Sequence, residues 1–284
     1  MVIDFNDLNK PYLIGEIGIN HNGDLKIAKK LLDACHACGW DCAKFQKRTP
    51  EIAIPEGQKN ILKDTPWGEM TYLKYKEKIE FSKREYDYIE KYCSEKPLDW
   101  SMSVWDLKSL EFSIKYDIPF IKIPSALITN DELIIESSNT GLPLIVSTGM
   151  STLIEVDHAV NILEEKAKSY ALLHSNSTYP AATDELNLNT IPYFIERYKC
   201  TVGYSGHEYG LTPTVIAVSL GAKIIERHIT LSHHMWGTDQ SASIEITGMD
   251  MIVKRIKSEA NVLGKYDKIL FESELVNRKK LRGD

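Results

Sequence analysis

The chain has 284 residues, 43% hydrophobic and 26% charged, which is ordinary for a globular protein long enough to bury a core. Its formal net charge of −6 argues against nucleic-acid binding, because nucleic-acid-binding surfaces are normally basic. No apolar run approaches the roughly 20 residues that span a bilayer, and the start "MVIDFNDLNK" lacks the apolar segment of a signal peptide. The five unevenly spread cysteines suit a reducing cytoplasm better than a disulfide framework, so we expect a cytoplasmic protein without membrane contact.

Short apolar runs rich in β-branched residues recur along the chain and alternate with amphipathic segments of helical period. In chain order, the predicted strands cover residues 12–19, 40–46, 98–104, 119–124, 142–148, 170–175, 200–205 and 222–228. One intervening segment, "STLIEVDHAVNILEEKAK", begins with a capping box made by Thr152 and Glu155. About eight strand–helix units predict a (β/α)8 TIM barrel, for which about 250 residues are typical. A doubly wound sheet is the alternative, but no GxGxxG follows the first strand.

The domain organisation follows from the linkers. No Gly/Ser-rich segment divides the chain, so residues 1–284 are predicted to form a single barrel domain. The long gap after the second strand holds an insert at about residues 48–81, which includes "TPWGEMTYLKYKEKIEF". We expect this aromatic and charged insert to fold over the barrel mouth or to form an interface. The last residues, "ESELVNRKKLRGD", are expected to be a short tail.

One cysteine-rich segment invites a metal interpretation. The sequence "CHACGWDC" brings together Cys35, His36, Cys38 and Cys42. However, the helical spacing of "LKIAKKLLDACHAC" places Cys35 and Cys38 on an apolar stripe, and Cys42 lies beyond Gly39 in the next element. Because cysteine packs as a small hydrophobic residue, we favour core packing over a metal cluster.

Polar residues gather at the predicted strand ends. The active sites of such barrels form at the carboxyl ends of the strands, so polar residues there are informative. In chain order these residues are Glu16, Lys44, Gln46, Ser103, Lys122, Ser125, Ser151, Ser177, Tyr179, Ser205, His207, Glu226 and His228. Two lysines, two histidines and many hydroxyls on one rim are hard to explain as packing, so we predict a functional site there.

Strand alternation indicates which way two of these side chains point. Glu226 and His228 are two residues apart and share a strand face with Ile224, so they should point into the barrel. An inward carboxylate and imidazole need partners, because burial without them costs several kcal/mol.

The two lysines pose the same problem. Lys44 in "CAKFQ" and Lys122 in "FIKIPS" are flanked by apolar residues and cannot easily reach bulk water. Each lysine could form an ion pair with Glu16 or Glu226. A shared anionic ligand is the other interpretation, and it explains both lysines at once.

The motifs "GEIGINHNG", "KFQ", "KIPSA", "STGMS", "SNSTYP", "GYSGHE", "ERHIT" and "WGTDQSASIE" run in order from about residue 11 to about residue 275. As a set they closely resemble the sialic acid synthase family. The resemblance implies a (β/α)8 barrel that condenses phosphoenolpyruvate with an open-chain aldose or N-acetylated amino sugar. It implies a sialic, legionaminic or pseudaminic acid as product, and a divalent metal, Mn²⁺ or Mg²⁺, as cofactor.

The resemblance also implies roles for individual residues. His207 and His228 match metal ligands, whereas Glu16, Tyr179 and Asp239 match positions near the sugar. The positions that bind the phosphate and carboxylate of phosphoenolpyruvate are matched by Lys44, Lys122, Ser103, Ser125, Ser151, Ser177 and Ser205. Gln46 is assigned to substrate binding with them, and either Glu16 or Glu226 is the candidate for proton transfer. One departure is Ser177, where some members have asparagine and others serine.

Many relatives continue into a C-terminal antifreeze-like domain, which lends an arginine to the site of the partner subunit. The sequence here ends at the expected tail, which leaves the acceptor sugar and the usual swapped dimer open. We nevertheless expect a homo-oligomer.

Two other functions remain open at this point. A metal-independent Schiff-base aldolase would use Lys44 or Lys122 as its nucleophile, and a non-catalytic protein would only bind a sugar acid. His174, His233 and His234 could add metal ligands, but a strand-end histidine and a solvated loop pair explain them better.

Overall fold

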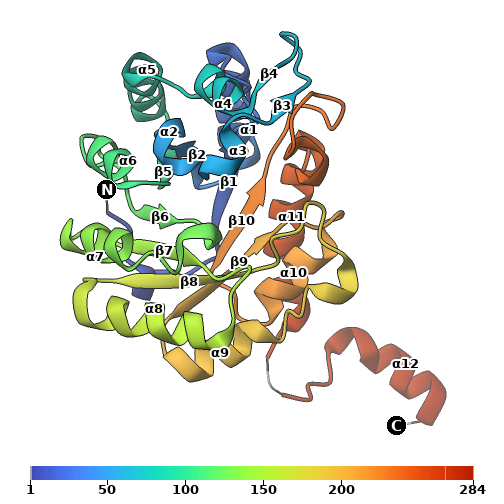
Figure 1. Cartoon of the computed structure of the whole chain (residues 1–284). Helices are drawn as coiled ribbons and strands as arrows, with labels where there is room; N and C mark the ends of the chain where they lie inside the picture. Colours follow the sequence, from blue (N-terminus) through green and yellow to red (C-terminus); the bar gives the residue numbers. More distant parts are fainter. Residues whose placement is uncertain (1, 266, 284) are drawn as a thin grey trace.

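The computed structural model describes residues 2–265 and 267–283. Eight parallel strands close into a barrel in the order β1-β10-β9-β8-β7-β6-β5-β2, as Figure 1 shows. Their bounds are β1 Tyr12–Gly18, β2 Cys42–Lys47, β5 Asp99–Val104, β6 Ile121–Ile123, β7 Leu144–Ser147, β8 Tyr170–Ser175, β9 Thr201–Gly206 and β10 Ile224–His228. Each strand falls within or overlaps one of the eight predicted runs, so the TIM-barrel prediction is confirmed.

Helices surround the barrel and connect its strands. They are α1 Leu25–Cys38, α5 Lys83–Ser94, α6 Leu107–Ser113, α7 Asp131–Asn139, α8 Leu153–Lys166, α9 Thr190–Tyr198, α10 Thr212–Ser219 and α11 Ile246–Leu263. The predicted capping box begins α8: the Thr152 amide donates to Glu155 Oε2 at 2.7 Å, and the Glu155 amide donates to Thr152 Oγ1 at 3.4 Å. A last helix, α12 Glu272–Arg282, lies apart from the barrel in Figure 1. Within the described residues, no helix is both long and apolar enough to cross a bilayer.

The end of the barrel opposite the strand carboxyl ends is filled with apolar side chains. Phe5, from the short 3-10 helix Phe5–Asp7, packs there against inward residues of the strands. The other buried members of this layer are Tyr12, Ile14, Cys42, Phe120, Ile145, Ala171, Leu173 and Ile224. The layer closes this end of the barrel, and the buried charged residues described below lie above it.

The cysteines of the "CHACGWDC" segment are separated by the barrel wall. Cys35 packs in the large core between the strands and the helices, and Cys38 packs against the same core. Cys42 lies in the inner apolar layer. The core-packing interpretation of Cys35 and Cys42 is therefore confirmed, and burial raises the pKa of both thiols.

The insert after β2 contains α2 Pro50–Ala53, α3 Glu56–Lys59, the antiparallel strands β3 Leu62–Lys63 and β4 Met70–Thr71, and α4 Tyr72–Ile79. Its aromatic side chains reach the loop that follows β10. The Trp236 ring makes edge contacts with Trp67 and Tyr75, at centroid separations of 5.9 and 5.1 Å. Figure 1 shows β3 and β4 beside this loop. The insert therefore lies at the end of the barrel where the carboxyl ends of the strands meet.

A buried ion pair outside the barrel fastens β10 to the loop after β9. Arg227 Nη1 donates to Glu208 Oε1 at 2.9 Å and to Thr214 Oγ1 at 2.8 Å, and Nη2 donates to the Glu208 carbonyl at 2.7 Å. Glu208 directly follows His207, and Arg227 directly precedes His228. The ion pair therefore fixes the two backbone segments that carry these histidines.

Gly203 in β9 marks the tightest point of the barrel wall. A Cβ there would lie 2.3 Å from the Ile224 carbonyl oxygen and 2.5 Å from Leu173 Cδ2. We expect Gly203→Ala to lower the free energy of unfolding by about 1–3 kcal/mol or more, because the barrel cannot widen locally. Urea denaturation followed by circular dichroism measures this change.

The matched control is Gly57→Ala in α3, where an added Cβ meets nothing within 4 Å. This substitution should leave the urea midpoint unchanged or slightly higher, since alanine is the better helix former. Equal midpoints for the two variants would contradict the packing argument.

Candidate active site

Four buried charged residues form a layer across the barrel interior, directly above the apolar layer. They are Glu16 of β1, Lys44 of β2, Lys122 of β6 and Glu226 of β10, each at most 4% exposed. Lys44 Nζ pairs with Glu16 and lies 3.5 Å from Glu226 Oε2. Lys122 Nζ lies 3.4 Å from Glu226 Oε1. The predicted inward orientation is confirmed, and the ion pairs considered from the sequence are present.

Neighbouring hydroxyls complete this layer. Lys122 Nζ donates to Ser147 Oγ at 2.7 Å, and Ser205 Oγ donates to Glu226 Oε1 at 3.0 Å. Glu226 is thus the centre of the layer, because it contacts both lysines and one serine.

The electrostatics of the two lysines differ. Burial lowers the pKa of Lys122 to about 8, and Lys44 lowers it further while Glu226 opposes the shift. Burial also acts to lower the pKa of Lys44, but Glu16 and Glu226 outweigh it and the net shift is upward. Burial alone would raise the pKa of Glu226, yet Lys122 and Lys44 hold it well below its usual range. Lys44 therefore keeps its proton more strongly than an ordinary lysine, whereas Lys122 loses its proton at a lower pH than an ordinary lysine.

A cavity of about 210 Å³ opens above the charged layer. The predicted site residues that line it are Glu16, Lys44, Gln46, Ser103, Lys122, Ser125, Ser177, Tyr179, Ser205, His207, Glu226 and His228. They come from both ends of the chain and from most of its strands, so the structure brings together most of the residues singled out in the sequence.

Serine hydroxyls converge on Gly149 at one wall of this cavity. The Gly149 amide donates to Ser125 Oγ at 3.0 Å. A Cβ on Gly149 would lie only 2.2 Å from Ser177 Oγ and 3.2 Å from Ser175 Oγ. A side chain at this position would push these hydroxyls aside, and together with Lys122, which lines the same cavity, they offer several donors to an anion.

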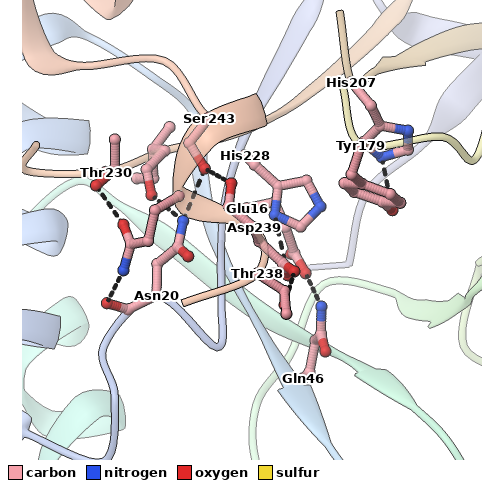
Figure 2. A network of polar contacts seen from close by, with 12 residues as sticks. Glu16, Asn20, Gln46, Tyr179, His207, His228, Thr230, Thr238, Asp239 and Ser243 are labelled. Carbon is pink, nitrogen blue, oxygen red and sulfur yellow. Dashed lines mark hydrogen bonds and ion pairs between the residues drawn. The ribbon is translucent and has the colours of Figure 1, made fainter. Parts of the chain in front are cut away.

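Two imidazoles face each other across the mouth of the cavity, with ring centroids 5.4 Å apart (Figure 2). His207 Nδ1 lies 2.6 Å from the Asn176 carbonyl, which can only accept, so Nδ1 carries the proton. Its Nε2 then accepts from the Tyr179 hydroxyl at 3.1 Å. Burial, followed by the nearby His228, lowers the pKa of His207 to about 3. His207 is therefore neutral, which is the form that binds metals.

The donor set partly matches a metal site. His228 Nδ1 is buried and has no hydrogen-bond partner, and it lies 3.8 Å from Asp239 Oδ2. His207 Nε2 carries a lone pair, and its other nitrogen is fixed by a backbone carbonyl, as is usual for metal-binding histidines. In residues 2–265 and 267–283, however, no three His, Cys, Asp or Glu side chains group closely enough to hold a metal. Two imidazoles suit an ion that leaves its other positions to water and substrate.

Two predicted site residues, Ser151 and Asp239, lie outside the cavity lining. Ser151 lines an adjoining cavity of about 620 Å³, which shares Ser175 and Ser177 with the first. Asp239 lies in the loop after β10, outside the cavity lining, and its Oδ2 is 3.8 Å from His228 Nδ1 (Figure 2).

The three additional histidines have other contacts. His174 Nε2 contacts the Leu186 carbonyl at 2.7 Å, and His174 lines the adjoining cavity rather than the one with the two lysines. His233 Nε2 contacts the Ser243 carbonyl at 2.8 Å, and His234 is exposed. Their geometry agrees with a strand-end histidine and a loop pair.

The sequence analysis missed several lining residues, namely Trp105, Pro124, Ala126, Ser147, Met150 and Ser175. Ser147 and Ser175 each end a strand at an inward position, so strict two-residue alternation would have found them. The other four follow strands, where alternation no longer applies.

Comparison with known proteins agrees with this geometry. The model of the NeuB family matches residues 31–268. N-acetylneuraminate-9-phosphate synthase of Drosophila melanogaster is 38% identical over 238 residues, which are 82% of this chain and 64% of that protein. The chain thus spans slightly less than two thirds of this relative. N,N'-diacetyllegionaminic acid synthase of Campylobacter jejuni is 32% identical over 276 residues, 95% of this chain and 82% of that protein.

A solved structure extends the similarity to the fold. N-acetylneuraminic acid synthetase from Leptospira borgpetersenii, in complex with citrate, superimposes with a TM-score of 0.84 at 27% identity, covering 98% of this chain and 94% of that one. The family model covers most of the chain, and the barrel and the ordered motifs agree with it. The chain therefore belongs to the NeuB family.

Proposed function

We propose that the protein condenses phosphoenolpyruvate with an open-chain aldose, giving a 2-keto-3-deoxy sugar acid and phosphate. The observation that carries the proposal is the convergence of two buried lysines, a group of serine hydroxyls and two neutral imidazoles on one cavity. Relatives named as N-acetylneuraminate-9-phosphate and N,N'-diacetyllegionaminic acid synthases support this type of reaction. Their products differ in the sugar, so family membership alone leaves the acceptor open.

The charged layer suits phosphoenolpyruvate, which carries up to three negative charges. Lys44 and Lys122 supply two ammonium groups, and the hydroxyls near Gly149 supply neutral donors for the phosphate and carboxylate oxygens. An arriving anion must compete with Glu16 and Glu226 for the lysines, so we infer that the ion pairs loosen when it binds. Until an anion binds, the ion pairs with Glu16 and Glu226 keep both lysine side chains extended toward the cavity.

The reaction forms one carbon–carbon bond and breaks one carbon–oxygen bond. C3 of phosphoenolpyruvate attacks the aldehyde carbon, and the aldehyde oxygen takes a proton. Water adds at C2 and loses a proton, and the resulting tetrahedral carbon expels phosphate by cleavage of its C–O bond. Glu16 and Glu226 are the carboxylates placed to accept or return these protons, because both line the cavity.

His207 and His228 would hold the divalent cation, Mn²⁺ or Mg²⁺. When bound, the cation would supply electrophilic activation of the aldehyde. Tyr179, which donates to His207 Nε2 in the free chain, would give up that contact and become available to the sugar.

The reaction itself is the first test. Phosphate release from phosphoenolpyruvate should occur only when an acceptor is present, and mass spectrometry should identify a 2-keto-3-deoxy acid. The acceptor panel contains N-acetylmannosamine, its 6-phosphate, 2,4-diacetamido-trideoxyhexoses and simple aldoses. Borohydride with pyruvate should trap no adduct, since the lysines bind anions rather than form imines. A trapped adduct at Lys44 or Lys122 would indicate a Schiff-base aldolase. No phosphate release with any acceptor would favour a sugar-acid-binding protein.

The metal assignment has a binding readout. His207→Ala should weaken Mn²⁺ binding, measured by electron paramagnetic resonance, by about tenfold or more, because one of two protein ligands is lost. EDTA should abolish turnover and Mn²⁺ should restore it. His234→Ala, at an exposed histidine, is the control and should bind Mn²⁺ like the unmodified protein. Equal Mn²⁺ affinity in His207→Ala and His234→Ala would refute the assignment.

The lowered pKa of Lys122 predicts a pH dependence. Raising the pH through about 8 removes the ammonium proton in the free enzyme, so one positive charge for phosphoenolpyruvate is lost. kcat/KM for phosphoenolpyruvate should therefore fall above this pH, approaching about tenfold per pH unit. Lys122→Arg keeps its charge and should lose this alkaline decline, even if its rate is lower. A flat profile up to about pH 9.5 in the unmodified enzyme would contradict the assignment.

A further inference from the structure

Two buried cations of the insert are not used by the proposed reaction. Arg48 directly follows β2, and Lys76 lies in α4; they are 7% and 5% exposed. The Arg48 guanidinium lies 4.3 Å from the ring centroid of Trp105, which lines the cavity. Its Nη2 also donates to Gln46 Oε1. Arg48 therefore borders the cavity on the side of the insert.

Lys76 is held among aromatic rings. Its Nζ lies 5.3 Å from the ring centroid of Tyr72 and 5.1 Å from that of Tyr75. Burial, followed by repulsion from Arg48, lowers the pKa of Lys76 to about 7, against the opposing effect of Asp239 and Glu80. The two cations are thus close enough to repel each other.

In the part of the chain that the structure describes, no carboxylate contacts either cationic group, although Asp239 and Glu80 favour the charged form of Lys76 from farther away. Among the described residues, the structure shows no ion pair to Arg48 or Lys76, whereas the neighbouring Lys47 pairs with Glu80 at 2.5 Å. Asp239 Oδ2 lies 3.8 Å from His228 Nδ1. Burying a cation without a contacting counter-ion is costly, so two such cations in one region, one of which borders the cavity, point to an anion that comes from outside the chain.

The buried polar atoms of this region that lack hydrogen-bond partners can all act as donors. Arg48 Nε, Trp105 Nε1 and the Tyr75 hydroxyl are buried and lack hydrogen-bond partners within the described chain. The first two can only donate, and the third can donate. An anion rich in acceptor oxygens would satisfy them together with the two charges, which the hydroxyl of a neutral sugar could not.

The position of Arg48 relative to Glu16 and the two histidines indicates which part of the acceptor sugar Arg48 would contact. Gln46 Nε2 donates to Glu16 Oε1 at 3.1 Å, while Gln46 Oε1 accepts from Arg48. Figure 2 shows Gln46 on the side of the Glu16 carboxylate away from His228. A sugar whose aldehyde lies at the histidines and whose chain passes Glu16 and Gln46 would bring its far end to Arg48.

We propose that the acceptor is a sugar phosphate, and that Arg48 and Lys76 bind the phosphomonoester on the carbon farthest from its aldehyde. This inference rests on the proposed condensation and names the substrate class for the same site. Trp105 and Tyr75 donate to the remaining phosphate oxygens. The insert is then a specificity element, and the barrel supplies the chemistry.

The test compares N-acetylmannosamine with its 6-phosphate at saturating phosphoenolpyruvate. The unmodified enzyme should favour the phosphate by at least about 100-fold in kcat/KM, because two charge-assisted contacts each contribute about tenfold or more. Lys76→Met and Arg48→Met should each reduce this preference by about tenfold or more. Lys74→Met, at an exposed lysine on the same helix, is the matched control and should keep the full preference.

The outcomes separate this inference from the proposed reaction. Condensation with an equal or greater preference for the neutral sugar would overturn the phosphate assignment and leave the reaction intact. Unchanged preference in both Lys76→Met and Arg48→Met would overturn the residue assignment. Lys76→Arg keeps the charge and should retain most of the preference, which distinguishes lost binding from lost folding.

A binding measurement covers the case in which neither sugar reacts. Calorimetry should show that the 6-phosphate binds to the unmodified protein at least about tenfold more tightly than to Lys76→Met. That result would support the phosphate site even if the proposed condensation failed. Equal affinities would overturn it.

Discussion

The mutual neutralisation of Glu16, Lys44, Lys122 and Glu226 is the constraint on which the rest of the structure depends. Each of these charges is out of reach of bulk water, and each would be costly alone. The barrel must therefore hold four strands in a fixed register so that the side chains meet. The apolar layer beneath them gives that register its rigidity and keeps water from entering from below. Under the proposed function, an anion would meet two lysines that the barrel already holds at the cavity, and only their ion pairs with Glu16 and Glu226 would have to loosen.

Much of this arrangement was accessible from the sequence because strands repeat every two residues. The inward face shared by Ile224, Glu226 and His228 follows from spacing alone, and the structure places all three inside the barrel. The two-residue spacing no longer predicts side-chain orientation beyond the end of a strand. The backbone turns at Gly149, so Ser151 faces the adjoining cavity although its motif suggested the main one.

The insert was the least predictable part, for a related reason. "YLKYKEKI" contains three lysines, and helical spacing alone does not distinguish the one that is buried. The burial of Lys76 depends on Tyr75 meeting Trp236, a residue far along the chain. Arg48 acquires its environment in the same way, from Trp105 after a different strand. Contacts of this kind are made between loops, and no local pattern in the sequence records them.

The Arg227–Glu208 pair has a consequence for how such a protein can diversify. It locks the two imidazole-bearing segments together from the outer side of the barrel, by buried contacts outside the cavity lining. The insert is tied to the loop after β10 mainly through aromatic rings, which tolerate changes in shape and size. Mutations can therefore accumulate on the insert side of the cavity mouth while the segments that carry His207 and His228 keep their positions. Under the proposed function, a lineage built in this way could exchange one acceptor sugar for another without having to evolve its carbon–carbon bond chemistry again.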